Sequence, residues 1–160
     1  MLLQDLLYQV ALRSVQGSTR IEIADVQIDS RAVSKGSCFV AIRGSQRDGH
    51  AFIDAAISNG AIAVVCEHLP ERLHEQVVYV ETAQAAEAAG IMSHRFYQEP
   101  SLSVKLVGVT GTNGKTTIAT LLWKLFTGLG YTCGLISTVE NKIGSETLDA
   151  THTTPDAVKL

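Results

Sequence analysis

The sequence predicts an α/β protein with a parallel sheet. Up to residue 100, apolar runs of strand length alternate with helix-periodic stretches, which is typical of one compact α/β unit. After Pro100-Ser101, a glycine-rich turn with a lysine and two threonines lies between an apolar run and a second helical pattern. We therefore predict two domains, over residues 1–100 and 101–160 of the 160-residue chain.

The strands of the first domain are predicted from its apolar residues. Alternation from Ile21 to Ile28 predicts one strand, and continuous apolar runs predict three buried strands, at residues 38–42, 61–66 and 77–80. Before them, one helical face within residues 1–14 is formed by Leu2, Leu3, Leu6, Leu7 and Val10.

Two more helices are expected in this domain. One covers residues 51–59 and is closed by Gly60, a residue suited to the left-handed turn that often ends a helix. The other begins after Thr82 as its capping residue and ends before Pro100. Its apolar face is formed by Ala85, Ala89, Met92 and Phe96.

The second domain has fewer predicted elements. The run 104–109 predicts a buried strand, residues 132–137 another, and Gly144 the turn of a hairpin. A helix beginning near Lys115 has the apolar face Ile118, Leu121, Leu122, Leu125, Phe126 and Leu129. Thr154-Pro155-Asp156 is typical of another helix start. A doubly wound sheet needs more βα units than residues 101–160 provide, so we expect the chain to stop inside this domain.

Composition and charge exclude several classes of protein. Apolar residues make up 46% of the chain, which is too much for a disordered protein, and a net charge of −3 argues against a general nucleic-acid binder. The three cysteines are interpreted as buried free thiols, and the five histidines show no metal-ligand spacing with them. Without a membrane span or the basic start of a secretory signal, we expect a cytoplasmic protein with no membrane or nucleic-acid partner.

Residues Gly108 to Thr117 carry the strongest functional signal. Glycines let backbone N–H groups approach a phosphate, and the start of the following helix is electropositive. Lys115 adds a point charge, and Thr116 offers an oxygen to Mg²⁺. The general pattern has a glycine where this chain has Val109, but the Gly-Lys-Thr core is intact. An ordinary strand-to-helix turn explains neither the buried strand nor the two threonines, so we predict the truncated start of a P-loop ATPase-type parallel-sheet domain.

Other polar segments are ambiguous when taken alone. Thr153-Thr154-Pro155 suits either an anion site or a plain helix cap. Asp29-Ser30-Arg31 and the loop 45–50 have the composition of exposed turns. The sequence contains neither a nucleophile–base pair nor a paired-carboxylate signature. It therefore indicates a phosphate site without the groups that would complete a reaction.

Together these segments resemble the Mur ligase family, ATP-dependent enzymes that add amino acids to the peptidoglycan precursor. The family carries the loop 110–117 in this off-pattern form, and the resemblance covers essentially the whole chain. Besides that loop, it rests on Asp29-Ser30-Arg31, 33–36, 39–42 with Gly44, Asp48-Gly49-His50, Phe52-Ile53, Gly60-Ala61 and Val64-Val65.

The resemblance implies two substrate sites. For the UDP-MurNAc substrate it assigns Ile28 and Ser30 to the uracil, Ser45, Gln46 and Arg47 to the diphosphate region, and Thr153 and Thr154 to the muramoyl part. For ATP it implies a site formed by Gly111, Thr112, Asn113, Gly114, Lys115, Thr116 and Thr117. In that site Lys115 is the catalytic residue on the β/γ-phosphates, and Thr116 is a ligand of Mg²⁺.

The resemblance also implies a reaction. ATP phosphorylates the side-chain carboxylate of a D-glutamyl residue, and the amine of a free diamino acid, diaminopimelate or lysine, attacks the acyl phosphate. Thr112-Asn113 and the segments 137–141 and 153–156 favour this ligase over the one that adds D-Ala-D-Ala. We expect a monomer whose other metal ligands and amino-acid-selecting domain lie beyond Leu160, and hence a chain that is inactive alone.

Two interpretations from other classes stay open. A regulatory ATPase or GTPase would need the phosphate loop but not the domain before it. A non-enzymatic UDP-sugar binder would need the first domain but would leave Lys115 and Thr116 unexplained.

Overall fold

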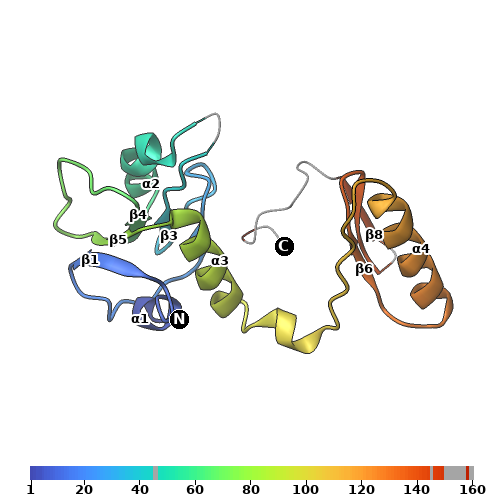
Figure 1. The fold of residues 1–160 in the computed structure, drawn as a ribbon. Coiled ribbons are helices and arrows are strands. Elements are labelled where there is room, and N and C mark those ends of the chain that lie inside the picture. Colours follow the sequence, from blue (N-terminus) through green and yellow to red (C-terminus); the bar gives the residue numbers. More distant parts are fainter. Residues whose placement is uncertain (45–46, 145, 150–157, 159–160) are drawn as a thin grey trace. The chain divides into compact units, whose positions relative to one another are not determined.

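The computed structural model describes residues 1–44, 47–144, 146–149 and 158 (Figure 1). The chain forms two compact units, Met1–Ser103 and Val104–Leu160. Each unit contains its own sheet. Among the described residues, no helix is long and apolar enough to cross a membrane.

The first unit is built on a five-stranded sheet of order β1-β5-β4-β3-β2. Neighbouring strands from β2 to β5 pair in parallel, and β1 pairs antiparallel with β5. The predicted α/β class with a parallel sheet is therefore confirmed. The strands are β1 (Leu12–Gln16), β2 (Val26–Gln27), β3 (Cys38–Val40), β4 (Ala63–Cys66) and β5 (Val78–Thr82).

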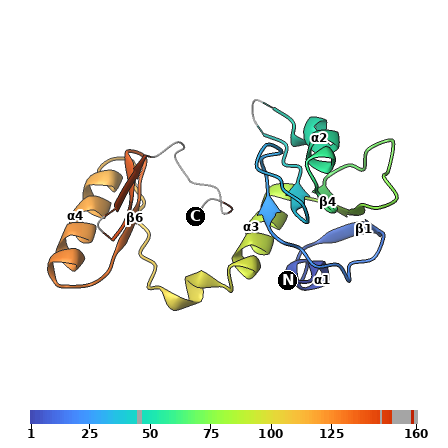
Figure 2. The same ribbon diagram turned by 180° about the vertical axis from the view of Figure 1, so that it is seen from behind.

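Helices cover both faces of this sheet, which gives it two apolar cores (Figures 1 and 2). The helices α1 (Leu3–Leu6) and α3 (Ala85–Phe96) bury their apolar residues against one face. The short 3₁₀ turn η1 (Gly49–Phe52) and α2 (Ile53–Ser58) pack on the other. Alternate residues of β4 follow this division, because Val65 lies in the first core and Val64 in the second.

Gly60 ends the predicted helix as expected. Its φ is 114°, and a Cβ there would lie 2.8 Å from the Cα of Lys35. Both the left-handed conformation and the close backbone therefore require glycine.

Two predictions for the first unit are wrong. The helix expected within residues 1–14 ends at Leu6, because the backbone turns at Gln9 (φ 71°) and residues 12–16 pair with the edge of β5. Thr82 does not cap α3. It lies in β5, where its hydroxyl donates to the carbonyl of Ala11 at 2.9 Å. In both cases, pairing within the sheet determines the structure and overrides the helix signal of the local sequence.

The second unit contains the predicted helix and hairpin. The helix α4 (Lys115–Gly128) is followed by β6 (Gly134–Ile136), β7 (Glu140–Ile143) and β8 (Glu146–Asp149). These strands form an antiparallel sheet of order β6-β7-β8, with Gly144 (φ 59°) in the turn. A 3₁₀ turn, η2 (Pro100–Ser103), closes the first unit.

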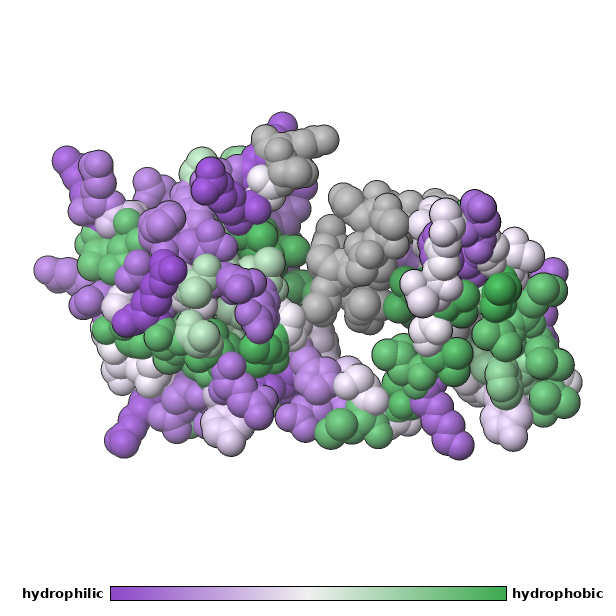
Figure 3. All heavy atoms as spheres, in the orientation of Figure 1, coloured by the Kyte–Doolittle hydropathy of each residue, from purple (hydrophilic) through white to green (hydrophobic). Residues whose placement is uncertain are grey.

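The strand expected at residues 104–109 is not formed. A strand needs a neighbour for its ladder of hydrogen bonds, and none of the described strands pairs with this segment. Leu106 is 87% exposed. The apolar face of α4 is also exposed, and hydrophobic residues gather over this part of the surface (Figure 3). Its exposed members are Ile118, Leu121, Leu125, Phe126 and Leu129.

Candidate functional site

The candidate phosphate loop lies at the amino-terminal end of α4. Gly114 is the N-cap residue, with φ 78°, and Gly111 has φ 150°. L side chains rarely adopt these conformations, so the backbone itself requires glycine. A Cβ at Gly108 or Gly114 would meet no atom within 4 Å. The loop is therefore open beside these two glycines.

The first turn of α4 offers donors to an anion. The N–H groups of Lys115, Thr116 and Thr117 have no acceptor one turn earlier in the helix. Gly114 has no side chain that could cap them. Since α4 has 14 residues, its dipole adds positive potential at this end.

Lys115 bends back over the loop. Its Nζ donates to the carbonyl of Gly111 at 2.6 Å and to that of Thr112 at 3.3 Å, and the residue is exposed. The ammonium group therefore lies at the same turn as the free N–H groups. This arrangement suits a phosphate, which a compact cation and several N–H donors hold together.

Thr138, which was not among the predicted site residues, lies beside the candidate loop. The hydroxyl of Thr138 lies 3.3 Å from the hydroxyl of Thr116. The turn that carries Thr138 is fixed by Ser137, whose Oγ donates to the carbonyl of Glu140 at 2.7 Å and accepts from the N–H of Val139 at 3.3 Å. In the sequence, Thr138 is only a hydroxyl residue that follows a predicted strand. Its position could be interpreted only once the structure had placed it beside the first turn of α4.

The first unit holds the other predicted site residues in segments that follow strands. Ile28 comes directly after β2 and packs partly against the first core. In the turn beyond it, Arg31 makes two bonds to the carboxylate of Asp29, at 2.7 and 2.9 Å. The hydrogen bond and then the charge of Asp29 raise the pKa of Arg31. The carbonyl of Ser30 accepts from Asn59 Nδ2 at 2.8 Å, so this turn has a defined position.

Arg47 lies in a hairpin that follows β3. The N–H of Gly44 donates to the carbonyl of Arg47 at 3.0 Å. The backbones of Arg43 and Asp48 form an isolated antiparallel β-bridge. Arg43 and Arg47 are both exposed, which makes the hairpin cationic. We refer to the described residues Arg43, Gly44, Arg47 and Asp48 as the Arg47 hairpin.

Four predicted site residues, Ser45, Gln46, Thr153 and Thr154, lie outside the described residues, as does the predicted helix start at 154–156. The described parts of the two candidate sites belong to different units, with Ile28, Ser30 and Arg47 in the first and Gly111–Thr117 in the second. Within the described parts of the chain, no cluster of three or more His, Cys, Asp or Glu could hold a metal ion.

Fold and site define an α/β protein of two units, with a glycine-rich turn and a lysine at the start of the helix α4 in the second. Comparison with known protein families and with related proteins identifies the family. The chain belongs to the Mur ligase family. Residues 22–97 match the family model described as "Mur ligase family, catalytic domain", and residues 109–160 match "Mur ligase middle domain".

Relatives with assigned names match the whole chain. A UDP-N-acetylmuramoyl-L-alanyl-D-glutamate–2,6-diaminopimelate ligase of Cytophaga hutchinsonii is 52% identical over 100% of this chain and 33% of its own length. The ligase of the same name from Bacteroides fragilis is 49% identical, with the same coverage. The chain thus spans about one third of the length of the curated relatives it matches.

Solved structures agree with these matches. A structure of a 2,6-diaminopimelate ligase of this type is similar with a TM-score of 0.74 and 27% identity, over 99% of this chain and 31% of that one. MurF ligase from Thermotoga maritima, in complex with ADP, has a TM-score of 0.51 and 30% identity, over 65% of this chain and 23% of that one.

Proposed function

We propose that this chain is the amino-terminal third of an ATP-dependent ligase of peptidoglycan synthesis. The complete enzyme would join 2,6-diaminopimelate to UDP-N-acetylmuramoyl-L-alanyl-D-glutamate. The observation that carries the proposal is the open, donor-rich turn at Gly111–Thr117, in a chain matched over its whole length by ligases of that name. A phosphate loop alone would support only nucleotide binding.

In the second unit, we propose that Gly111 to Thr117 hold the phosphates of ATP, with Lys115 on the β/γ-phosphates. The MurF relative from Thermotoga maritima was solved with ADP, which supports a nucleotide here. The hydroxyls of Thr116 and Thr138 are close enough for one Mg²⁺ to meet both, and hydroxyl oxygens suit that ion. Bound Mg²⁺ would neutralise charge on the transferred phosphoryl group.

In the first unit, we propose that the uridine nucleotide binds along the segments after β2 and β3. Ile28 and Ser30 would meet the uracil, and Ser45, Gln46 and Arg47 the diphosphate. Two exposed arginines in the Arg47 hairpin supply the charge that a diphosphate needs. Thr153 and Thr154 would meet the muramoyl part of the substrate.

The related ligase that adds D-Ala-D-Ala is the alternative. Two solved MurF structures match this chain over 80% and 65% of its length, with TM-scores of 0.57 and 0.51. The diaminopimelate ligase matches over 99% with a TM-score of 0.74. Coverage and similarity both favour the diaminopimelate enzyme.

We further propose a cytoplasmic monomer whose substrates are UDP-MurNAc-dipeptide and free diaminopimelate. The present chain should not catalyse ligation by itself, because it spans only about one third of its relatives. Formation of tripeptide product by the purified chain would contradict this part of the proposal.

A titration with Mg-ATP tests the phosphate loop. Lys115→Ala should weaken binding at least about tenfold, since a charge-assisted contact is lost. Lys124→Ala removes another exposed lysine of the same helix and should have no effect. Equal losses in both variants, or none in either, would contradict the proposed role of Lys115.

A further inference from the structure

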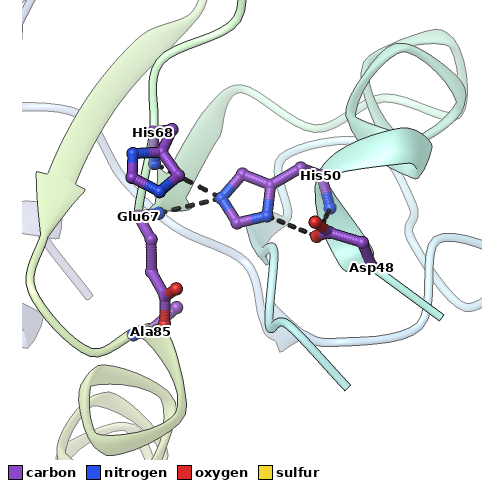
Figure 4. A network of polar contacts seen from close by, with 5 residues as sticks. All are labelled: Asp48, His50, Glu67, His68 and Ala85. Carbon is purple, nitrogen blue, oxygen red and sulfur yellow. Dashed lines mark hydrogen bonds and ion pairs between the residues drawn. The ribbon is translucent and has the colours of Figure 1, made fainter. Parts of the chain in front are cut away.

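His50 ties the Arg47 hairpin to the rest of the first unit (Figure 4). Its Nδ1 lies 2.6 Å from Oδ1 of Asp48, which also accepts from the backbone N–H of His50 at 3.0 Å. On the other side of the ring, Nε2 is 3.0 Å from the backbone N of Glu67 and 3.4 Å from that of His68. One imidazole thus joins the loop after β3 to the residues after β4.

These contacts define the protonation of His50. A backbone N–H can only donate, so Nε2 must carry a lone pair. The proton is then on Nδ1, facing the carboxylate of Asp48. The side chain of His50 is only 17% exposed, which leaves the ring little freedom. The geometry therefore corresponds to a neutral histidine in one tautomer and one orientation.

Glu67 extends the connection to a third segment. Its Oε1 accepts from the N–H of Ala85, the first residue of α3, at 3.1 Å. The residue before it, Gln84, makes no side-chain capping bond, so Glu67 caps this helix from another part of the chain. Asp48, His50 and Glu67 thus connect the Arg47 hairpin to the end of β4 and the start of α3.

The backbone next to the hairpin is equally restricted. The N–H of Gly49 donates to the carbonyl of Ile42 at 2.9 Å. A Cβ at Gly49 would lie 2.6 Å from that carbonyl oxygen and 2.7 Å from the backbone nitrogen of Ile42. The backbone at Ile42 and the backbone at Gly49 are therefore held against each other. This contact fixes the base of the hairpin that carries Arg43 and Arg47.

We infer that Asp48, His50 and Glu67 form a positioning unit, which holds the Arg47 hairpin ready for the diphosphate of a nucleoside diphosphate. The inference rests on the proposed function of the first unit. His50 is a positioning residue that acts through Arg47 and makes no contact with the substrate. Arginines whose backbone is held in place before binding lose less conformational entropy when the ligand arrives, so the unit raises affinity without adding a contact.

Calorimetric titration of the 160-residue chain with UDP-MurNAc-L-Ala-D-Glu tests the inference. His50→Ala and Asp48→Ala should each weaken binding about tenfold, whereas Asp48→Asn should retain most of it, because the amide oxygen still accepts both bonds. His74→Ala, at an exposed ring outside the network, should bind like wild type. In a double-mutant cycle, the losses of binding free energy caused by His50→Ala and Arg47→Ala should be clearly non-additive.

The outcomes separate the inference from the function on which it rests. A wild-type chain that binds no uridine nucleotide contradicts the proposed function. Wild-type binding with an unchanged affinity in His50→Ala, or additive losses with Arg47→Ala, overturns the positioning unit alone. If His50→Ala does not fold, the imidazole ¹⁵N spectrum of the wild-type chain decides. It should show Nδ1 protonated and Nε2 unprotonated, and the opposite tautomer would overturn the inference.

Discussion

The hydroxyl oxygens of Thr116 and Thr138 lie 3.3 Å apart, and this contact joins the first turn of α4 to the turn after β6. Thr116 belongs to the loop that the sequence marks as a phosphate site, whereas Thr138 is 22 residues further along the chain. The network around Ser137 keeps the second turn in place. A phosphate-bound Mg²⁺ at this position would therefore meet two hydroxyls instead of one.

Replacing Thr138 tests this pairing. Thr138→Val keeps the shape but removes the hydroxyl and should weaken Mg-ATP binding about three- to tenfold, the range of one hydrogen-bonding group. Thr138→Ser should restore binding, and Thr132→Val, at an exposed threonine before β6, should leave it unchanged. Calorimetry measures all three variants. Equal affinities of the valine and serine variants would mean that the hydroxyl has no role.

Two glycines of the first unit should respond oppositely to alanine. Gly49→Ala forces a methyl group onto the backbone of Ile42 at 2.6 Å and should destabilise the unit by about 1–3 kcal/mol. Gly90 lies within α3, where an added Cβ would meet no atom within 4 Å beyond the helix's own backbone, so Gly90→Ala should stabilise the unit by about 0.5–1 kcal/mol. Urea unfolding followed by circular dichroism gives both values. A stable Gly49→Ala variant would show that the hairpin base is not closed as described.

Acid should release the Asp48–His50 contact. The backbone N–H of His50, and then its imidazole, lower the pKa of Asp48 below its usual value. Because the folded pKa is the lower one, the contribution to stability is complete above the usual aspartate pKa and is lost as pH falls through the folded pKa.

The difference in unfolding free energy between wild type and Asp48→Ala should show this pH dependence. It should be constant near neutral pH and shrink only in acid, whereas Asp54→Ala, at an exposed aspartate, should show a smaller dependence. Unfolding curves from about pH 7 to about pH 2 provide the comparison. A difference that grows as the solution becomes more acidic would contradict the lowered pKa.

The three thiols should differ in reactivity. Burial, and then the charge of Asp25, raise the pKa of Cys38 to about 12, and burial raises that of Cys66 to about 11. At about pH 8 very little thiolate exists at either residue. Iodoacetamide should therefore label the half-buried Cys133 first in the native chain, and Cys133→Ser should remove the fast reaction. Rapid labelling of Cys38 in that variant would contradict the described core.

Sequence patterns predicted those elements whose position depends on local spacing. The apolar runs gave β3 and β4, the periodic leucines after Lys115 gave α4, and Gly60 marked a helix end. The pattern at residues 1–14 correctly indicated burial, since Leu3, Leu6, Leu7 and Val10 lie in the core. It did not indicate where the helix ends, because the pairing of residues 12–16 with β5 depends on a partner far along the chain.

The remaining differences have the same cause. The run at 104–109 has the composition of a buried strand but lacks a pairing neighbour in the described chain. Glu67 caps α3 from 18 residues away, and Thr138 reaches Thr116 across 22 residues. Around the candidate loop, the glycine turn and the helix start at Lys115 were predictable because their spacing is local. The groups that support them were not, since only the folded chain brings them together.

We propose that the first unit holds a uridine nucleotide substrate and that the second holds part of an ATP site. Calorimetric titration of the chain with UDP-MurNAc-L-Ala-D-Glu, beside a titration with Mg-ATP, tests this most directly. We predict saturable binding of the uridine compound that survives Lys115→Ala, is weakened by Arg47→Ala, and is stronger than any binding of Mg-ATP. Tight binding of Mg-ATP with no response to the uridine compound would contradict the account and indicate a plain nucleotide-binding protein.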